Sequence, residues 1–327
     1  MVNADDDTFL ESQLPMTAQA QELGDVTAGE PSGNAARLGR LGQIEDPPSQ
    51  GALLWRRLKR DKFALAGLVI ILFTIFLAIA APLVAPYDPY AQNVRERLQP
   101  IGSPGHLLGT DGNGRDILSR LIYGSRTALV AATLPVMIAG IIGMAMGLVA
   151  GYFGGWIDSL LMRIADVLFA FPAILLAIAI VAALGPSLVN AMVALAIVFI
   201  PAFARLVRSL VLTLRERDYV QAAKASGATS SSVLTRHILA NALSPIIVFA
   251  TLQTGQMIIF AAALSFLGLG VPPGTPDWGK MANDGRDSML IAPWVTTLPG
   301  MAILFLSMGF NLLGDGLRDA LDPTLKT

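Results

Sequence analysis

Cysteine is absent from the 327-residue sequence, and charged residues make up only 14% of it. The first absence excludes disulfides, thiolate nucleophiles, iron–sulfur clusters and thiolate zinc sites. The two histidines, His106 and His237, are far apart, and neither lies in a metal-ligand pattern. A net charge of −1 creates no overall field that would attract nucleic acid. The sequence therefore offers no candidate metal site and no nucleic-acid surface.

Motifs for energy conversion and catalysis are also missing. No Gly-x-x-x-x-Gly-Lys-Ser/Thr loop is present, so the chain has no phosphate cradle of its own. No serine–histidine–acid or paired-carboxylate constellation can be assembled, and we predict no catalytic residue. The stretch 111–116 begins like a calcium loop, but Arg115 occupies a ligand position and Ile122 replaces the bidentate glutamate. Any uphill work must therefore be powered by a partner.

Long apolar runs are what the sequence has instead. Hydrophobic residues make up 54% of the chain, and they lie in runs of about twenty residues, enough to cross about 30 Å of hydrocarbon. We predict an all-α, polytopic membrane protein with about six transmembrane helices. The predicted spans are residues 63–85, 127–151, 160–184, 189–210, 243–268 and 294–314.

Basic residues indicate the orientation of the predicted spans. They cluster directly before the first span, at Arg56, Arg57, Lys59, Arg60 and Lys62. Because Lys and Arg beside a span favour the cytoplasmic side, we expect the N-terminus to lie inside. Six spans then place the C-terminus inside as well. The segment 211–242 becomes the longest cytoplasmic loop.

Residues 1–50 differ in composition from the rest of the chain. They are acidic, with scattered Gly, Pro, Ser and Gln and no apolar periodicity. Such a segment has too few apolar side chains to offset, by their burial, the conformational entropy that it would lose on folding. We therefore predict a disordered cytoplasmic tail. Its start, with Asp5, Asp6 and Asp7, is not that of a signal peptide.

The middles of the predicted spans hold almost no ionisable group. The polar candidates there are Gln253 and Gln256, three residues apart on one helix face. They can line a translocation path or join neighbouring helices by hydrogen bonds, and the second interpretation has at least equal weight. Asp158, Arg163 and Asp166 lie nearer a span end, where we expect them to pair or reach the interface rather than form an ion site.

The cytoplasmic segment 215–240 carries its own helical pattern. Helix-forming residues run from Arg215 to Ser226, and Gly227 can supply the positive φ that ends a helix. Serines at 230–232 can cap a second helix that leads into the fifth span. The adjacent alanines 222 and 223 on an exposed helix suit close approach of another surface. A purely structural hairpin explains these features equally well.

These residues resemble a known loop. The run Tyr219-Val220-Gln221-Ala222-Ala223-Lys224-Ala225-Ser226-Gly227-Ala228, followed by residues 236–242, resembles the EAA loop of ABC importer permeases. In that family the loop is the coupling helix that docks into the ATPase subunit. The resemblance implies ATPase-coupling roles for Tyr219, Gln221, Ala222, Ala223, Gly227 and Ile238. Two positions depart from the family pattern, Gln221 replacing glutamate and Ala240 replacing proline.

Further stretches narrow the resemblance to the dipeptide/oligopeptide (peptide/nickel) importer family, second-subunit type. They are residues 108–120, 166–172, 265–270, 276–279 and 311–319, in order across about residues 50–327. The resemblance implies a type I ABC importer permease that forms half of the pore for di- or oligopeptides, or for related small peptides such as glutathione. It implies a second permease, two ATP-binding subunits that use ATP and Mg, a solute-binding protein, and a place in the bacterial inner membrane. No cofactor is implied for this chain.

Three alternatives remain at this stage. A nickel importer of the same family is one, although no His, Cys or Met cluster on the outer side favours it. An ion-coupled secondary carrier would need an ion-binding group at the membrane midplane, which the sequence lacks. A membrane-embedded enzyme would need convergent polar residues near an interface, and only Asp158, Arg163 and Asp166 come close.

Overall fold

The computed structural model describes residues 58–59 and 61–321, and every regular element within them is a helix. The predicted acidic tail, residues 1–50, lies outside the described residues. The described residues belong to one compact unit, Leu53–Thr327. The prediction of an all-helical architecture is confirmed for this part of the chain.

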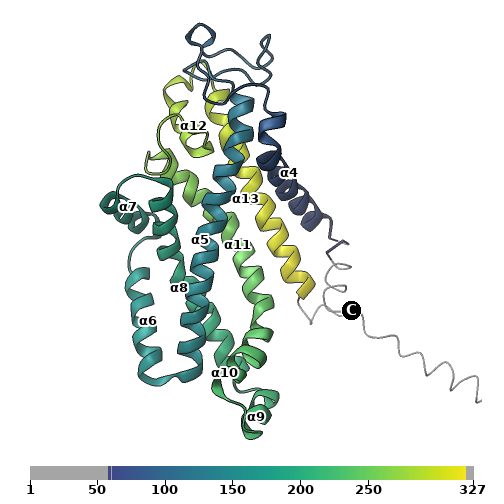
Figure 1. Ribbon diagram of the computed structural model, residues 1–327, viewed down its shortest axis with the longest axis vertical. Helices are drawn as coiled ribbons and strands as arrows, with labels where there is room; N and C mark the ends of the chain where they lie inside the picture. Colours follow the sequence, from purple (N-terminus) through teal and green to yellow (C-terminus); the bar gives the residue numbers. More distant parts are fainter. Residues whose placement is uncertain (1–57, 60, 322–327) are drawn as a thin grey trace, which may run out of the picture. The chain divides into compact units, whose positions relative to one another are not determined.

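Five helices are long and apolar enough to cross a membrane (Figure 1). They are α4 (Lys62–Val84), α5 (Ile117–Phe153), α8 (Leu188–Leu214), α11 (Ala240–Phe266) and α13 (Trp294–Leu321). Two shorter helices, α6 (Gly155–Phe169) and α7 (Ala173–Leu184), pass the same test only as a pair. The predicted six spans are therefore present if this pair counts as one.

The third predicted span, residues 160–184, is broken. Helices α6 and α7 meet at an angle of 88°. The break lies at Pro172, which precedes the first residue of α7. Proline disfavours the helical conformation of the residue before it, so α6 ends at Phe169 rather than continuing. The turn before α6 lies at Gly154 and Gly155, which adopt positive φ values of 67° and 57°.

Helix α5 begins well before the apolar run predicted at residue 127. Its N-cap is Asp116, whose Oδ2 accepts a hydrogen bond of 2.7 Å from the backbone N–H of Ser119. Thr110 and Asp111, which precede it in the chain, do not cap this helix. Thr110 bonds within the outer loop, and Asp111 pairs with Arg115 at 2.7 Å. Helix ends are set by such polar contacts rather than by the length of an apolar run.

Glycines spaced four residues apart bring α5 and α8 together. Gly143, Gly147 and Gly151 lie on one face of α5. A Cβ atom at Gly147 would lie 2.5 Å from the carbonyl oxygen of Ala204 on α8. Small residues at this spacing let two helix backbones approach closely, the usual basis of packing within a membrane. The same device joins α4 to α13, where a Cβ at Gly67 would lie 2.5 Å from the Gly309 carbonyl oxygen.

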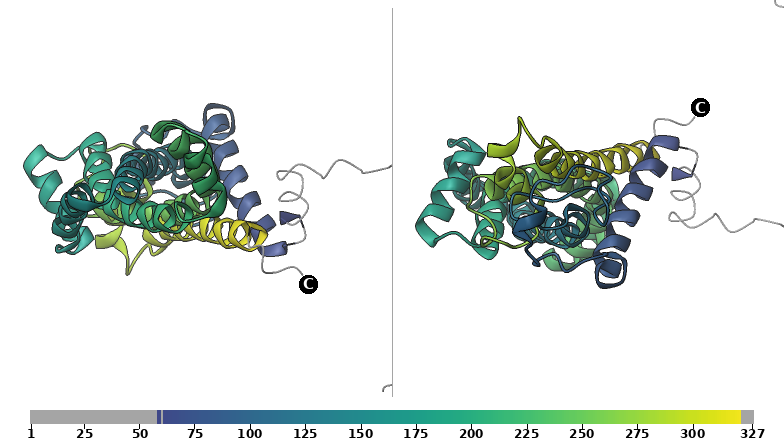
Figure 2. Two further views of the ribbon diagram at one scale, coloured as in Figure 1. Left: turned by 90° about the horizontal axis from the view of Figure 1, so that it is seen from below. Right: turned by 90° about the horizontal axis from the view of Figure 1, so that it is seen from above.

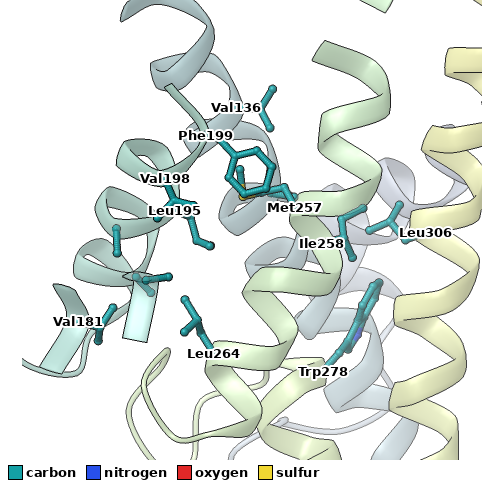
Figure 3. Packing of buried hydrophobic residues seen from close by; sticks show 14 of the residues in the cluster. Val136, Val181, Leu195, Val198, Phe199, Met257, Ile258, Leu264, Trp278 and Leu306 are labelled. Atoms are coloured by element: carbon teal, nitrogen blue, oxygen red, sulfur yellow. The ribbon is translucent and has the colours of Figure 1, made fainter. Parts of the chain in front are cut away.

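The main hydrophobic core lies between α5, α8, α11 and α13 (Figure 3). Phe199 and Phe203 of α8 make edge-to-face contacts with Phe260 and Phe249 of α11, at centroid distances of 5.4 and 5.0 Å. Trp278 is buried in this core and donates from Nε1 to the Leu121 carbonyl at 3.0 Å. Trp278 also packs against Gly124 of α5.

The end of the bundle opposite the coupling segment is closed by loops and by the short helices η1 (Val94–Glu96), α12 (Trp278–Asp284) and η3 (Arg286–Ser288) (Figure 2). Arg115 and Arg120 are buried there and share the carboxylate of Asp111, at 2.7 and 3.6 Å. Asp277 caps α12 and accepts from the Lys280 N–H at 2.9 Å. Burial raises the pKa of Asp277, while hydrogen bonds from Lys280, Ser265 and Gly279 act against this rise.

Candidate functional site

The predicted coupling segment forms a short helix, a turn and a second helix. Helix α9 (Asp218–Ala225) lies at the lower end of the molecule in Figure 1. After the turn come α10 (Ser230–Ser232) and the π-helix η2 (Val233–Leu239), which leads directly into α11. The predicted helix–turn–helix is confirmed. The π-helical stretch was not predicted; π-helices are rare and frequently occur at functional sites.

Two backbone hydrogen bonds fix the turn after α9. The N–H of Gly227 donates to the Lys224 carbonyl at 3.0 Å, and the N–H of Ala228 donates to the Ala223 carbonyl at 3.1 Å. Gly227 has a φ of +81°, as the sequence predicted. This double bonding is a Schellman motif, which ends a helix sharply at a glycine. The next helix is capped by Thr229, whose Oγ1 accepts from the Ser232 N–H at 3.4 Å, rather than by the serines expected.

A second hydrophobic cluster anchors this segment to the spans. Val220 of α9 packs with Val233 and Ile238 of η2, and with Val207 and Val211 of α8. All five side chains are fully buried. Helix α9 is therefore fixed to α8 by its inner face and to α11 through η2. A displacement of α9 cannot occur without moving both spans or breaking this cluster.

The structure separates the predicted coupling residues into two groups. Tyr219 is 42% exposed, and Gln221, Ala222 and Gly227 are exposed as well. Ala223 is half-buried. Ile238 is 0% exposed and belongs to the second cluster. The four exposed residues and the accessible part of Ala223 can contact another protein, while Ile238 is buried beneath them.

Polar contacts tie α9 to the ends of α5 and α8. The side-chain amide of Gln221 donates from Nε2 to the Arg215 carbonyl at 2.9 Å, just past the end of α8. Arg215 in turn donates from Nη1 to the Gly151 carbonyl of α5 at 3.0 Å. The Lys224 ammonium lies 5.5 Å from the ring centroid of Tyr152. A glutamate at position 221 has no proton to donate at neutral pH and could not make the first contact.

Ion pairs between α6 and α8 lie beside the coupling segment and were not fully predicted. Asp158 accepts two hydrogen bonds from Arg208, at 2.5 and 2.6 Å. Asp166 pairs with Arg205 at 2.7 Å, and the Arg205 guanidinium lies 4.1 Å from the Phe169 ring centroid. The expected pairing of these acids is confirmed. Their partners could have been found from the spacing of the two arginines, three residues apart on one face of α8.

The two predicted path residues differ in their surroundings. Gln256 of α11 is exposed, and Gln253 is half-buried. Neither side-chain amide has a hydrogen-bond partner among residues 58–59 and 61–321, so neither joins α11 to another helix there. The face of α11 that carries Gln256 continues down through Leu252, Phe249 and Pro245, at helical spacing. These three residues line a groove of about 410 Å³.

The described residues offer an exposed docking helix and a polar position on an open helix face, but no reaction centre. No group of three or more His, Cys, Asp or Glu within 58–59 and 61–321 could hold a metal ion. The arrangement of α9, η2 and α11 instead favours transmission of movement from a bound partner to the spans.

Comparison with protein families identifies matching regions across most of the chain. A family described as binding-protein-dependent transport system inner membrane component matches residues 143–327. A second, described as the N-terminal TM domain of oligopeptide transport permease C, matches residues 49–100. Together the two matched regions include α4, the coupling segment and every helix from α6 onward.

Individual relatives agree with these matches. A dipeptide transport system permease protein from Alkalihalophilus pseudofirmus is 50% identical, covering 84% of this chain and 90% of its own. Glutathione transport system permease proteins from Pectobacterium atrosepticum and Escherichia coli are 48% and 46% identical, covering 84% and 90% of this chain. They are covered over 91% and 96% of their own lengths.

A solved structure shares the fold. A chain of the MetNI methionine ABC transporter, in an inward-facing conformation, aligns with a TM-score of 0.52 and 19% sequence identity. The alignment covers 62% of this chain and 97% of that one. At this identity the likeness concerns the arrangement of helices alone.

Proposed function

Because the chain belongs to the family of binding-protein-dependent transport system inner membrane components, we propose that it forms half of the translocation pore of an ATP-driven peptide importer. The substrates are di- or oligopeptides, or small peptides such as glutathione. Relatives named for dipeptide and glutathione transport favour this choice over nickel. As a permease subunit the chain has no ATPase activity of its own.

The partners follow from this role. A second permease completes the pore, two ATP-binding subunits use ATP and Mg, and an extracytoplasmic solute-binding protein delivers the substrate. The chain itself binds no cofactor. The excess of Lys and Arg on the side of the coupling segment supports an orientation with both termini in the cytoplasm.

The observation that carries the proposal is the construction of the coupling segment. Helix α9 exposes Tyr219, Gln221 and Ala222, while its buried Val220 contacts the second hydrophobic cluster. An ATPase subunit that binds the exposed face of α9 would displace α9 together with α8 and α11. Because the Schellman turn and the buried cluster resist local distortion, the displacement reaches the spans instead of being absorbed in the loop.

The open face of α11 supplies the proposed path. Gln256 is exposed on it, and its side-chain amide can supply both a donor and an acceptor to the peptide groups of a substrate. Gln253, which is half-buried, is the second candidate. Alternating access then requires α11 to change its position relative to the second permease as the ATPases close.

Substitution at Ala223 tests the proposal. Ala223→Glu places a longer, charged side chain where α9 would meet the ATPase. We expect co-purification of the ATPase subunits and ATP-dependent peptide uptake both to be lost, because the surfaces can no longer approach closely. Ser231→Glu is the matched control, since Ser231 is exposed on the neighbouring α10 and is not part of α9. Unchanged assembly and uptake in the Ala223 variant would contradict the coupling role.

A further inference from the structure

The two ion pairs that join α6 to α8 differ in how completely their polar atoms are used. Asp158 and Arg208 form a closed pair, because both carboxylate oxygens of Asp158 accept from Arg208. Asp166 and Arg205 make a single contact of 2.7 Å, between Oδ1 and Nη2. Asp166 Oδ2 and the other donors of Arg205 have no partner among residues 58–59 and 61–321. The second pair is therefore open to a further charged ligand.

This open pair is exposed within the predicted spans. The side chains of Asp166 and Arg205 are 64% and 48% exposed. Residue 166 lies six residues into the predicted span 160–184, and residue 205 lies five residues before the end of the predicted span 189–210. At about 1.5 Å per residue, these positions are roughly 7–9 Å inside the membrane. Ionisable groups at such positions almost always face the bundle interior or a water-filled cavity, because their exposure to lipid is costly.

The break between α6 and α7 needs the same surroundings. Helix α6 ends at Phe169, and residues 170–172, which precede α7, are exposed. The last backbone hydrogen bond of α6 runs from the Ala170 N–H to the Asp166 carbonyl at 2.9 Å. The carbonyls of residues 167–169 accept from no backbone N–H in the described part of the chain. Unpaired backbone groups at membrane depth are tolerated only where they are buried in protein or line a water-filled cavity.

The open pair also borders the proposed path. Glycines of α5 pack on one side of α8, and the exposed Arg205 and Ser209 lie on the side turned away from them. Leu206, next to Arg205, lines the groove that continues the path face of α11, together with Phe249 and Leu252. The open face of α8 therefore connects the ion pair with the path.

The charges at this point match the two ends of a peptide. The C-terminal end of α6 has free carbonyl oxygens and a partial negative charge, and the Asp166 carboxylate adds to it, so an ammonium group is favoured there. Arg205 keeps unused N–H donors in the planar arrangement that binds a carboxylate. The Phe169 ring centroid lies 4.1 Å from Arg205 Cζ. The ring covers one face of the guanidinium and leaves the donors at its edge free.

We propose that Asp166, the C-terminal end of α6 and Arg205 form a relay site on the translocation path. The site binds a zwitterionic peptide, with its α-ammonium group at Asp166 and its α-carboxylate at Arg205. This assignment rests on the proposed function, which supplies the peptide and places this end of α8 toward the cytoplasm. The two side chains pair with each other when no peptide is bound, so their re-pairing favours release. A site on a path must bind strongly enough to admit its substrate and weakly enough to let it leave.

Protection of a single thiol tests the relay site. Ser209→Cys places the chain's only thiol on the open face of α8, about one turn from Arg205. The assembled importer, in nanodiscs and without the solute-binding protein, is treated with a water-soluble methanethiosulfonate, and modification of this chain is followed by mass spectrometry. We expect modification in the absence of peptide, and we expect millimolar dialanine to slow it. Asp166→Asn should raise the dialanine concentration for half protection about tenfold, as for the loss of one charge-assisted hydrogen bond.

Peptides with one blocked end show which charge binds at which residue. N-acetyl-dialanine lacks the ammonium group, so it should protect less well than dialanine, and Asp166→Asn should weaken its protection no further. Dialanine amide lacks the carboxylate and should show the same behaviour with Arg205→Gln. Arg205→Lys keeps a cation and should retain most of the protection by dialanine.

Matched variants decide between the outcomes. Asp158→Asn removes the same charge from the same helix but belongs to the closed pair, so dialanine should protect this variant as it protects the wild type. Ala202→Cys, about one turn from Arg205 on the other side, is a second reporter. The proposal is overturned if neither cysteine is modified in the assembled importer, which would place this face against the second permease. It is also overturned if dialanine gives no protection, or if Asp166→Asn and Arg205→Gln are both protected like the wild type.

The relay site and the importer role fail separately. Absence of protection with intact ATP-dependent uptake would contradict the relay site alone. Intact protection with unchanged uptake in the Ala223→Glu variant would contradict the coupling role alone.

Discussion

Gln221 replaces the glutamate that is usual at this position of the coupling loop, and its side chain makes a different contact. The relatives of this loop usually have glutamate at this position, whereas here an amide donates to the Arg215 carbonyl at 2.9 Å. This hydrogen bond links helix α9 to the backbone just after the end of α8. Gln221 is therefore used for internal bonding, and in the proposed docking its exposed surface would contribute contact area rather than charge.

Replacement of this amide by the family's usual residue is informative. Gln221→Glu should remove the donor and bring a carboxylate to the Arg215 carbonyl, so the link between α8 and α9 should loosen. We expect faster amide hydrogen exchange in residues 215–225 and no change in α4. Gln253→Glu serves as a control for the added charge. Equal exchange in the Gln221 variant and the wild type would show that the bond does not restrain the loop.

The roles of individual residues could be predicted only in part from the sequence. Tyr219, Ala222 and Gly227 are exposed, as the docking hypothesis requires, but Ile238 is buried against Val220. A buried position and a contact position can carry the same residue type, so sequence similarity alone cannot separate them. The acids at 158 and 166 were expected to pair, and the structure takes their partners, Arg205 and Arg208, from α8.

Among the contacts between helices, the close approach of α5 and α8 contributes most to the packing. The three glycines of α5 face Phe203, Ala204, Val207 and Val211 of α8 without any intervening side chain. This interface includes the part of α8 that also contacts the coupling segment. Any loosening here would weaken the proposed transmission of movement from α9 to the spans.

A side chain inserted between these helices should be poorly tolerated. Gly147→Val would place Cβ 2.5 Å from the Ala204 carbonyl oxygen and 2.7 Å from Val207 Cβ. Overpacking of this kind costs about 1–3 kcal/mol. We expect a lower melting temperature of the purified chain in detergent. Gly300→Ala is the control, because a Cβ there meets no atom within 4 Å, and similar melting of both variants would argue against tight packing at Gly147.

The sequence located the elements better than it located their ends. Apolar runs identified α4, α8 and α11 because a membrane span leaves a strong compositional signal. The start of α5 was missed because Asp116 and His106, 2.9 Å apart, fix it in the outer loop. The break at Pro172 carried a local signal, since proline restricts the residue before it, but the 88° angle depends on how α7 packs on α8.

The orientation of the whole molecule follows from charge distribution, and the absence of cysteine makes it simple to check. A single introduced cysteine is the chain's only thiol. We expect Asp287→Cys to react with an impermeant maleimide in spheroplasts, because Asp287 is exposed in the outer loop. Ser231→Cys, exposed in the coupling segment, should react only after the membrane is opened. The reverse pattern would contradict the proposed cytoplasmic termini.

The bend between α6 and α7 makes this chain a poor match to a bilayer of uniform thickness. Helix α6 has 15 residues and α7 has 12, so they rise roughly 22 and 18 Å, less than the hydrocarbon depth of about 30 Å. At 88° they cannot both follow the membrane normal. A span shorter than the hydrocarbon depth is accommodated by local thinning of the bilayer, by flanking side chains that reach the interface, or by association with another helix. Acyl-chain length should therefore act on this crossing more strongly than on the five continuous helices.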